Sequence, residues 1–323
     1  MIIPNTVFWE ITERCNLKCR HCYLGEREKA RAYQFVKEKA LAHLEALHKG
    51  GVKTILFMGG EPLLHSDIFE FVRIVGSYGY GLHAAILTNG LLLNEEVVIE
   101  LKRSGISAVQ VSIDGTGDSY KIIRGIDFAV IDENIKRLKN SKVVVQAKFT
   151  ITKKNFHEFE DVWRFCSENK ISLSTSLILG IGRAKGNLML KPRDYFSFFY
   201  KLFELNKKSK TISRQQFSLP DFSIEEYLES GVPEAGCVAG RGMFGITKDN
   251  RLVPCIYLSN FDTRKLFDFE FPEFDENFLV TINHHPLFKF FREESSKYFD
   301  CPIRRKIYGG KDPFSVYEFA KIF

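Results

Sequence analysis

The chain has 323 residues, of which 45% are hydrophobic, and its formal net charge is +6. This composition excludes an intrinsically disordered protein, and the length is enough for one large α/β domain with a smaller appendage. No apolar run reaches the roughly 18 residues of a spanning helix, and no signal peptide opens the chain, so we expect a cytoplasmic protein that binds no membrane. The basic residues are scattered, which favours a solvated surface over a nucleic-acid-binding patch.

Apolar, β-branched segments alternate with segments of helical periodicity through the first half of the chain. The predicted strands are residues 7–11, 53–58, 82–87, 108–113, 143–151 and 171–179. The predicted helices are residues 28–48, 68–77, 94–103, 132–139 and 156–168, the last with Asn155 as its expected N-cap. Strands and helices that alternate in this way indicate an α/β fold with a parallel sheet.

The sequence pattern changes near residue 185, where aromatic-rich helical segments replace the alternation and are followed by segments rich in Gly, Pro and Cys. We therefore predict three regions. They are a main α/β domain over residues 1–185, a helical linker over 186–235 and a C-terminal domain over 236–323.

Unusual residues follow five of the six predicted strands. They are Cys15, Cys19 and Cys22 after the first strand, Gly59, Gly60 and Glu61 after the second, Thr88 to Gly90 after the third, Ser112 and Asp114 at the fourth, and Gly180 to Arg183 after the sixth. Because the carboxyl ends of parallel strands meet at one edge of the sheet, these loops predict a single pocket.

Seven cysteines in a chain without an export signal favour metal binding or catalysis over disulfides. Three of them, Cys15, Cys19 and Cys22, lie within eight residues. Thiolates are ligands of iron–sulfur clusters and of zinc. A structural zinc site needs a fourth ligand, and the ring of His21 would point away if Cys22 were a ligand. Three thiolates on a 4Fe–4S cluster leave one iron open for chemistry, which favours the cluster.

The CxxxCxxC loop directly after a first strand resembles the signature of the radical S-adenosylmethionine (SAM) superfamily. The resemblance implies a partial (β/α)6 TIM-like barrel and a 4Fe–4S cluster held by the three cysteines. SAM would chelate the open iron and be cleaved to a 5′-deoxyadenosyl radical that abstracts hydrogen from the substrate. A flavodoxin or ferredoxin is the electron donor that such an enzyme is expected to use.

The other loops resemble the SAM-binding segments of the same superfamily. Gly59, Gly60 and Glu61 resemble the GGEP motif that binds the methionine amino group, for which glycine permits a close backbone approach and glutamate offers an anionic acceptor. Ser112 and Asp114 resemble residues that contact the ribose hydroxyls and the methionine end of SAM. Ile181 lies in a segment that resembles the one packed against adenine.

A second group of cysteines, Cys237, Cys255 and Cys301, lies in the C-terminal third. A predicted β-hairpin between the first two, with its turn at Asp249-Asn250, would bring Cys255 back toward Cys237. This arrangement resembles the SPASM and twitch domains, which implies a second, auxiliary 4Fe–4S cluster on these three thiolates.

The C-terminal pattern departs from a twitch domain in one respect. Arg304 stands where such a domain usually has a further cysteine after Cys301. The fourth ligand of an auxiliary cluster would then be the substrate, water, Asp300, His284 or His285. The alternative is a degenerate domain that holds no cluster.

The sequence also leads to a substrate hypothesis. Enzymes with such extensions most often modify peptides, so the main prediction is a cross-link, epimerisation or oxidation of a ribosomally made peptide. The alternative is the same radical chemistry on a haem precursor, a nucleotide or a sugar, and a remote alternative is a non-catalytic metal-binding module. Epimerisation would need a hydrogen donor, for which Cys166 is a candidate, although its place on an apolar helix face favours a structural role.

Overall fold

The computed structural model describes residues 1–25, 34–79, 81–184, 186–208, 237–260, 267–298 and 301–313. Its strands form one eight-stranded sheet in the order β6-β5-β4-β3-β2-β1-β7-β8. The strands are β1 Thr6–Thr12, β2 Thr54–Gly59, β3 His83–Thr88, β4 Ala108–Ser112, β5 Val145–Ile151, β6 Ser172–Leu177, β7 Met243–Ile246 and β8 Leu252–Val253.

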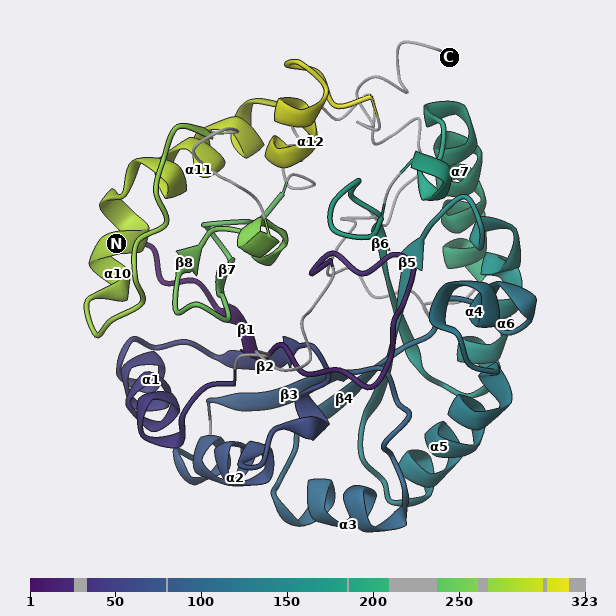
Figure 1. Ribbon diagram of the computed structural model, residues 1–323, viewed down its shortest axis with the longest axis horizontal. Helices are drawn as coiled ribbons and strands as arrows, with labels where there is room; N and C mark the ends of the chain where they lie inside the picture. The colour runs from purple at the N-terminus through teal and green to yellow at the C-terminus, as the bar shows by residue number, and fades with distance from the viewer. Residues whose placement is uncertain are drawn as a thin grey trace.

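Strands β1 to β6 are all parallel, as the sequence predicts. The predicted hairpin is confirmed, because β7 and β8 are antiparallel, and β7 also pairs in parallel with β1. The sheet ends at β6 on one side and at β8 on the other, so it is an open, partial barrel. Figure 1 shows the helices on the outside of this curved sheet.

Helices alternate with the strands up to β6, with two helices, α4 and α5, between β4 and β5. The α-helices are α1 Lys37–Lys49, α2 Ile68–Ser77, α3 Glu95–Arg103, α4 Asp118–Arg124, α5 Phe128–Asn140, α6 Phe159–Glu168, α7 Pro192–Lys208, α10 Phe278–His284, α11 Pro286–Tyr298 and α12 Pro302–Ile307. Short 3-10 helices are η2 Pro62–Leu64, η3 Phe156–Glu158, η4 Gly186–Leu188 and η6 Ile256–Asn260.

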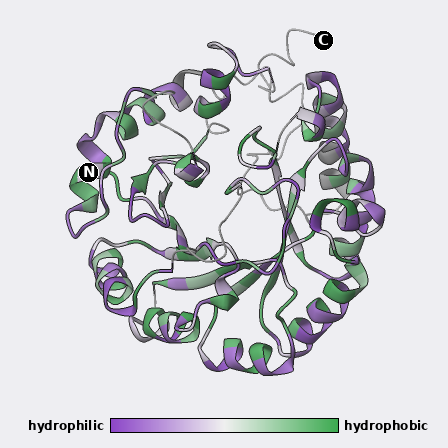
Figure 2. Ribbon diagram, in the orientation of Figure 1, coloured by the Kyte–Doolittle hydropathy of each residue, from purple (hydrophilic) through white to green (hydrophobic). Residues whose placement is uncertain are grey.

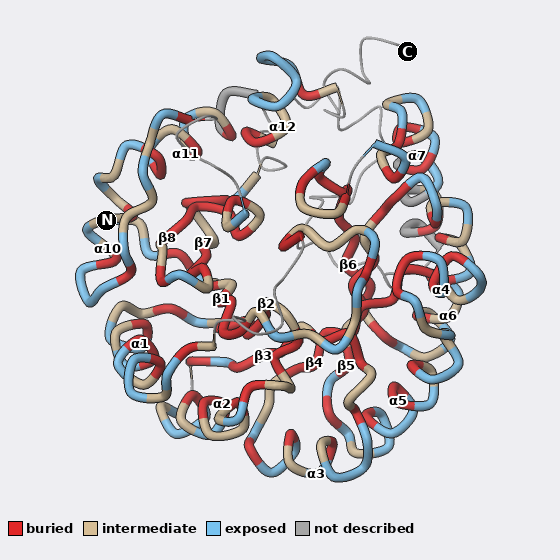
Figure 3. Tube along the Cα trace, viewed as in Figure 1, coloured by how far each residue is buried: buried red, intermediate tan, exposed pale blue. Residues whose placement is uncertain are grey.

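Apolar residues of the strands and of the inner helix faces form the main core. Trp9, Phe57, Phe71, Phe149 and Phe159 are among its largest members, and each is at most 1% exposed. Figures 2 and 3 show that buried, apolar segments face the sheet and that polar, exposed segments face outward. The sheet and its helices therefore form a rigid base for the loops at the strand ends.

Two predicted helices need correction. The first begins at Lys37 rather than at residue 28, and residues 26–33 lie outside the described part. Asn155 does not cap a helix: its Nδ2 donates to the carbonyl oxygens of Asp114 and Thr150, and a 3-10 turn precedes α6. The side chain of Asn155 thus joins two strand ends instead of a helix terminus.

The domain boundaries near residues 185 and 235 stay predictions. Residues 209–236, most of the predicted linker, lie outside the described part. Within the ranges that the structure describes, no helix has both the length and the apolar composition to cross a bilayer.

Candidate active site

A cavity that opens to solvent lies at the carboxyl ends of the strands, with an empty volume of about 1220 Å³. It is lined by residues from the ends of β1 to β6 and from the segment after β8, among them Cys15, Cys19, Cys22, Gly59, Gly60, Thr88, Asn89, Ser112, Arg183 and Cys255. The structure therefore brings the five predicted loops together around one space.

The cysteine loop after β1 is held by backbone hydrogen bonds from three directions. The amide of Glu61 donates to the carbonyl oxygen of Arg14 at 2.7 Å, and that of Arg20 donates to Ile123 at 2.8 Å. Arg183 donates from its amide to Cys22 and from Nε to Cys19, each at 2.9 Å. The loop is thus fixed against β2, α4 and the segment after β6.

Gly60 shows why the predicted glycine motif follows β2. A Cβ atom there would lie 2.0 Å from the carbonyl oxygen of Arg14, which is closer than any real contact. Only glycine lets the two loops approach this closely. The glycine therefore sets the position of the cysteine loop.

The three thiols have the chemistry that an iron–sulfur cluster needs. All three line the same cavity, and Cys19 is 8% exposed. In the described ranges no three His, Cys, Asp or Glu side chains converge closely enough to hold one ion. Thiolates that surround a space suit a cluster, because each iron takes its own thiolate.

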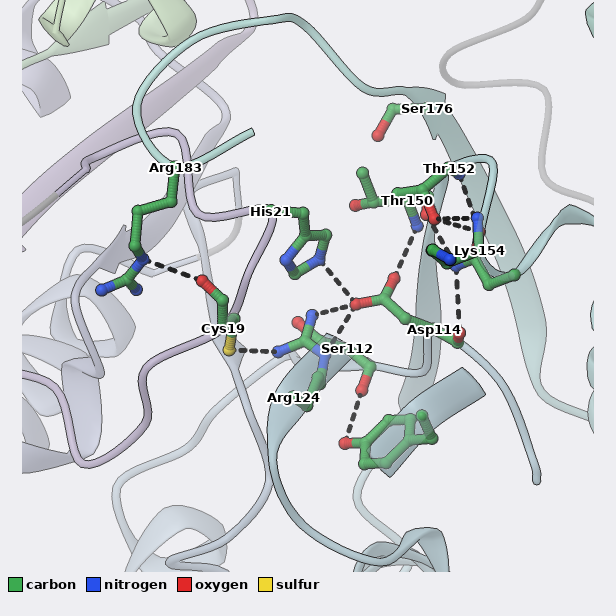
Figure 4. A network of polar contacts seen from close by, with 12 residues as sticks. Cys19, His21, Ser112, Asp114, Arg124, Thr150, Thr152, Lys154, Ser176 and Arg183 are labelled. Atoms are coloured by element: carbon green, nitrogen blue, oxygen red, sulfur yellow. Dashed lines mark hydrogen bonds and ion pairs between the residues drawn. The ribbon is translucent and has the colours of Figure 1, made fainter. Parts of the chain in front are cut away.

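Asp114 is the centre of a buried polar network beside the cysteine loop (Figure 4). Its Oδ2 lies 2.7 Å from His21 Nε2 and 2.6 Å from Arg124 Nε, and its Oδ1 accepts from the amide of Thr150 at 2.7 Å. Burial alone would raise the pKa of Asp114, but the charge of Arg124 and the contact with His21 lower it below its ordinary value. The carboxylate is therefore ionised and anchors both neighbours.

This network reaches the cysteines and the cavity. Arg124 Nη1 lies 3.9 Å from Cys19 Sγ, and the His21 ring lines the cavity. Since an ionised Asp114 can only accept, His21 Nε2 carries a proton in this contact and a neutral ring leaves Nδ1 as an acceptor. His21 Nδ1 is buried and has no hydrogen-bond partner in the described part of the chain.

Lys148, in the middle of β5, places an amino group in the cavity wall. It is 7% exposed, and its Nζ lies 3.5 Å from Ser174 Oγ. Burial lowers the pKa of Lys148 to about 7. Sequence reasoning missed this residue, although a lysine within a strand of mostly apolar residues was the signal that could have found it.

Residues 9–167 match the sequence pattern of the radical SAM superfamily, and this match contains the cysteine loop and the network just described. The chain belongs to the radical SAM superfamily. It is therefore an enzyme with a 4Fe–4S cluster and SAM as cofactors. When bound, these cofactors supply the electron and the carbon radical for hydrogen abstraction.

Similar proteins agree with this membership. The AdoMet-dependent heme synthase of Methanosarcina barkeri is 27% identical over 276 residues, which are 79% of this chain and 77% of that protein. A probable GTP 3′,8-cyclase of Saccharolobus solfataricus is 28% identical over 257 residues, 76% of this chain and 81% of that protein. The solved structure of Streptococcus suis SuiB bound to SAM shares the fold, with a TM-score of 0.71 and 18% identity over 97% of this chain and 76% of that chain.

The predicted SAM-binding residues of this radical SAM enzyme fall into two groups. Gly59, Gly60 and Ser112 line the cavity, whereas Glu61, Asp114 and Ile181 are buried behind its wall. Glu61 accepts from Thr88 Oγ1 at 2.7 Å and from the amide of Asn89 at 2.8 Å. Its carboxylate thus joins the ends of β2 and β3.

The second group of cysteines meets in one apolar cluster. Burial, followed by the neighbouring thiols of Cys237 and Cys301, raises the pKa of Cys255 well above its ordinary value. Cys255 also lines the cavity that the first three cysteines share. Arg304 Nε donates to both carboxylate oxygens of Asp312, at 2.9 and 2.8 Å, next to Cys301.

The remaining candidates lie elsewhere. Cys166 lies on the buried face of α6 and does not line the cavity, so the structure does not support it as a hydrogen donor. Burial raises the pKa of its thiol to about 12. Asp300 lies outside the described residues. His284 ends α10, and His285 accepts from the amide of Leu287 at the start of α11.

Proposed function

We propose that this radical SAM enzyme abstracts hydrogen from a small, carboxylate-bearing molecule of the haem-precursor type. The observation that carries the proposal is Lys148, a buried amine on the wall of a cavity whose other walls are largely apolar, with Phe8, Met58 and Leu87 among them. An anionic group bound beside Lys148 would favour its charged form. Apolar walls that also carry the cationic side chains of Lys148, Arg124 and Arg183 suit a flat apolar molecule with carboxylates.

Sequence similarity supports the same choice of substrate class. The heme synthase and the GTP cyclase each align with three quarters or more of this chain, and both are named for small molecules. The small-molecule alternative is therefore better supported than the peptide modification expected from the sequence. The likeness to SuiB, at 18% identity, concerns the fold alone.

We further propose how the two cofactors are held. Cys15, Cys19 and Cys22 bind the cluster that reacts with SAM, while the backbone at Gly59 and Gly60 and the Ser112 hydroxyl contact SAM from the opposite wall. Glu61 and Asp114 act from behind, since each fixes a loop that reaches the cavity. Ile181 supports the segment that holds Cys22 through Arg183.

An auxiliary 4Fe–4S cluster on Cys237, Cys255 and Cys301 is part of the proposal. These thiols share a buried cluster with an opening toward the cavity at Cys255. In the position where a fourth cysteine would stand, Arg304 is paired with Asp312. A cluster with three protein ligands there would keep one iron for the substrate or a small ligand.

The test uses anaerobically reconstituted protein with dithionite and SAM, and measures 5′-deoxyadenosine by chromatography. Iron coproporphyrin III, GTP and a peptide mixture are compared as substrates, with a Cys15→Ala/Cys19→Ala/Cys22→Ala variant as the blank. We expect the porphyrin to increase deoxyadenosine formation and to change in mass. If GTP or peptides increase deoxyadenosine formation and the porphyrin does not, the proposed substrate class is wrong.

A further inference from the structure

The inner face of the sheet, which faces away from the helices, changes character between β3 and β4. Phe8, Leu56, Ala85 and Leu87, from β1 to β3, pack in one hydrophobic cluster. Leu87 pairs in the sheet with Gln110 of β4. The polarity of the inner face therefore changes at this pair of neighbours.

From Gln110 onward, alternate residues of three neighbouring strands are polar. The residues between them, such as Val111, Ala147 and Leu173, belong to the main core under the helices. Side chains alternate between the two faces of a strand, so the polar set faces inward. This set consists of Gln110 and Ser112 on β4, Gln146, Lys148 and Thr150 on β5, and Ser172, Ser174 and Ser176 on β6. Apolar lining returns only at Leu177 to Leu179, where β6 ends.

The polar half of the inner face is enclosed. Gln110, Lys148 and Ser174 are 9%, 7% and 5% exposed. Their contacts across the strands are long, since Lys148 Nζ lies 3.5 Å from Ser174 Oγ, and Gln110 Nε2 lies 3.5 Å from Gln146 Oε1. Burying polar groups with such weak partners costs stability, and branched apolar residues usually fill this place in a parallel barrel. A ligand that accepts hydrogen bonds would offset this cost.

The chemistry of the polar half selects an anionic ligand. Its side chains are an amine, amides and hydroxyls, and the described residues of β4 to β6 include no carboxylate. Ser112 pairs with Lys148 in the sheet, so Gln110 is a diagonal neighbour of Lys148 on the same face, and both line the cavity. Two donors on adjacent strands suit the two oxygens of a carboxylate.

The other two cations of the cavity wall already hold the structure together. Arg124 forms an ion pair with Asp114, and Arg183 Nε donates to the carbonyl oxygen of Cys19. Lys148 is thus the cation that lies within the polar half, away from these structural contacts.

We propose that Gln110 and Lys148 together hold a carboxylate of the substrate, while Phe8 and Leu87 of the apolar half pack against its flat body. Ser174 is a positioning residue that holds the Lys148 amine. The inference rests on the proposed function and adds to it one orientation of the substrate in the cavity. It also names the chemical group by which the substrate is selected.

The test compares two porphyrins that differ only in their carboxylates. Reconstituted enzyme without SAM is titrated with iron coproporphyrin III and with its methyl ester, and the shift of the porphyrin absorption band gives each Kd. We expect the wild type to bind the acid at least about tenfold more tightly than the ester. Lys148→Met should weaken binding of the acid by at least about tenfold, and Gln110→Leu by about fivefold. Neither variant should change the Kd of the ester.

Two control variants separate this effect from general damage to the cavity. Lys153→Met removes an exposed lysine just after β5 and should bind both porphyrins as the wild type does. Leu87→Ala alters the apolar half and should weaken binding of the acid and the ester by the same factor.

The possible failures are distinguishable. If the wild type binds acid and ester equally well, or if Lys148→Met and Gln110→Leu weaken both porphyrins alike, the carboxylate subsite is wrong even where the porphyrin increases deoxyadenosine formation. If neither porphyrin binds, the proposed substrate class is wrong as well. Should Gln110→Leu fail to fold, Gln110→Glu keeps the size of the side chain and adds a repelling charge. That variant must then weaken binding of the acid and spare the ester.

Discussion

Asp114 is the residue on which the cysteine loop most depends. It is fully buried, yet three neighbours from three segments use its two oxygens: His21 on the loop, Arg124 on α4 and the amide of Thr150 on β5. A buried carboxylate in such a network is stable only while all of its charged and polar partners are present. Its loss would leave the Arg124 guanidinium without its buried partner.

We therefore expect Asp114→Asn to destabilise the protein by about 3 kcal/mol, the usual cost of breaking a buried ion pair. Denaturant unfolding of the reconstituted enzyme measures this loss of stability. A lower iron content would show that the cysteine loop is displaced. Asp118→Asn, an exposed change on α4, is the control and should cost under about 0.5 kcal/mol. Equal midpoints for the two variants would contradict the central role of Asp114.

Lys148 gives a prediction with a defined pH dependence. Its pKa falls from 10.5 in the unfolded chain to about 7 in the fold, so the unfolded state binds the extra proton between these values. The folded state is therefore penalised most at and below pH 7, and the penalty fades as the pH rises toward 10.5. Lys148→Met should raise stability near neutral pH by an amount on the order of a few kcal/mol, with the gain vanishing near pH 10.

Thermal unfolding across this pH range measures the Lys148 effect. Lys153→Met, which changes an exposed lysine just after β5, is the matched control and should show little pH-dependent change. A gain at Lys148 that does not vary with pH would show that the amine is not desolvated in the folded enzyme. The same variant should bind a carboxylate-bearing substrate more weakly.

At the scale of elements, the loop after β6 fixes the cysteine loop through a glycine. Gly182 has a φ of 62°, and a Cβ atom there would lie 2.4 Å from the carbonyl oxygens of Cys22 and Tyr23. Its neighbour Arg183 donates two hydrogen bonds to the same loop. Side chains larger than hydrogen would push these two segments apart.

Gly182→Ala should therefore lower iron retention and deoxyadenosine yield by at least about tenfold, since small displacements at a reacting centre have large effects. Gly79→Ala is the control, because Gly79 has a similar φ of 78° but nothing within 4 Å of the added methyl group. Both substitutions place alanine at a positive φ, which costs roughly 1 kcal/mol, but only Gly182→Ala also adds a steric clash. Equal yields from the two variants would contradict a positioning role for this contact.

The elements differ in how well the sequence predicts them. All six parallel strands and the meeting of five loops follow from local apolar patterns and from the geometry of parallel sheets. Helix α4 escaped prediction because it has only seven residues and follows Gly115-Thr116-Gly117, which reads as a turn. From the sequence, an asparagine at position 155 can cap a helix or donate to carbonyl groups equally well. Only the folded structure shows that the carbonyl oxygen of Asp114 lies beside it.

The candidate site likewise contains residues that the sequence predicts and residues that it does not. The cysteine loop and Gly59-Gly60 were recognisable because their spacing is itself the signal. The structural roles of Lys148, His21 and Arg124 could not be predicted, since these roles arise from contacts between segments far apart in the sequence.

At the scale of the whole molecule, the C-terminal segment is joined to the cysteine loop by a buried carboxylate. Glu10 on β1 accepts from Tyr23 Oη at 2.6 Å, from Ser259 Oγ at 2.8 Å and from the amide of Lys248 at 3.2 Å. Tyr23 and Tyr257 also stack edge to face with centroids 5.4 Å apart, so the residues next to Cys22 and near Cys255 are in contact. The two groups of cysteines thus belong to one connected structure.

This connection leads to a prediction about iron. The wild type should retain about eight iron atoms per chain, and the Cys237→Ser/Cys255→Ser/Cys301→Ser variant about four. The variant should still cleave SAM with dithionite but should fail to turn over substrate. Cys166→Ala, which alters the remaining cysteine, should leave the iron content unchanged. About four iron atoms in the wild type would exclude the auxiliary cluster.

The pairing of β7 with β1 has a consequence for how the protein forms. Strand β1 is synthesised first, but one of its edges stays unpaired until Met243 and its neighbours emerge, which takes on the order of ten to fifty seconds at ribosomal speed. During that interval the nascent chain exposes an apolar strand edge that invites pairing with other chains. Contacts this distant in sequence also slow folding. Recombinant yield should therefore depend on chaperones and on translation rate, and not only on the supply of iron.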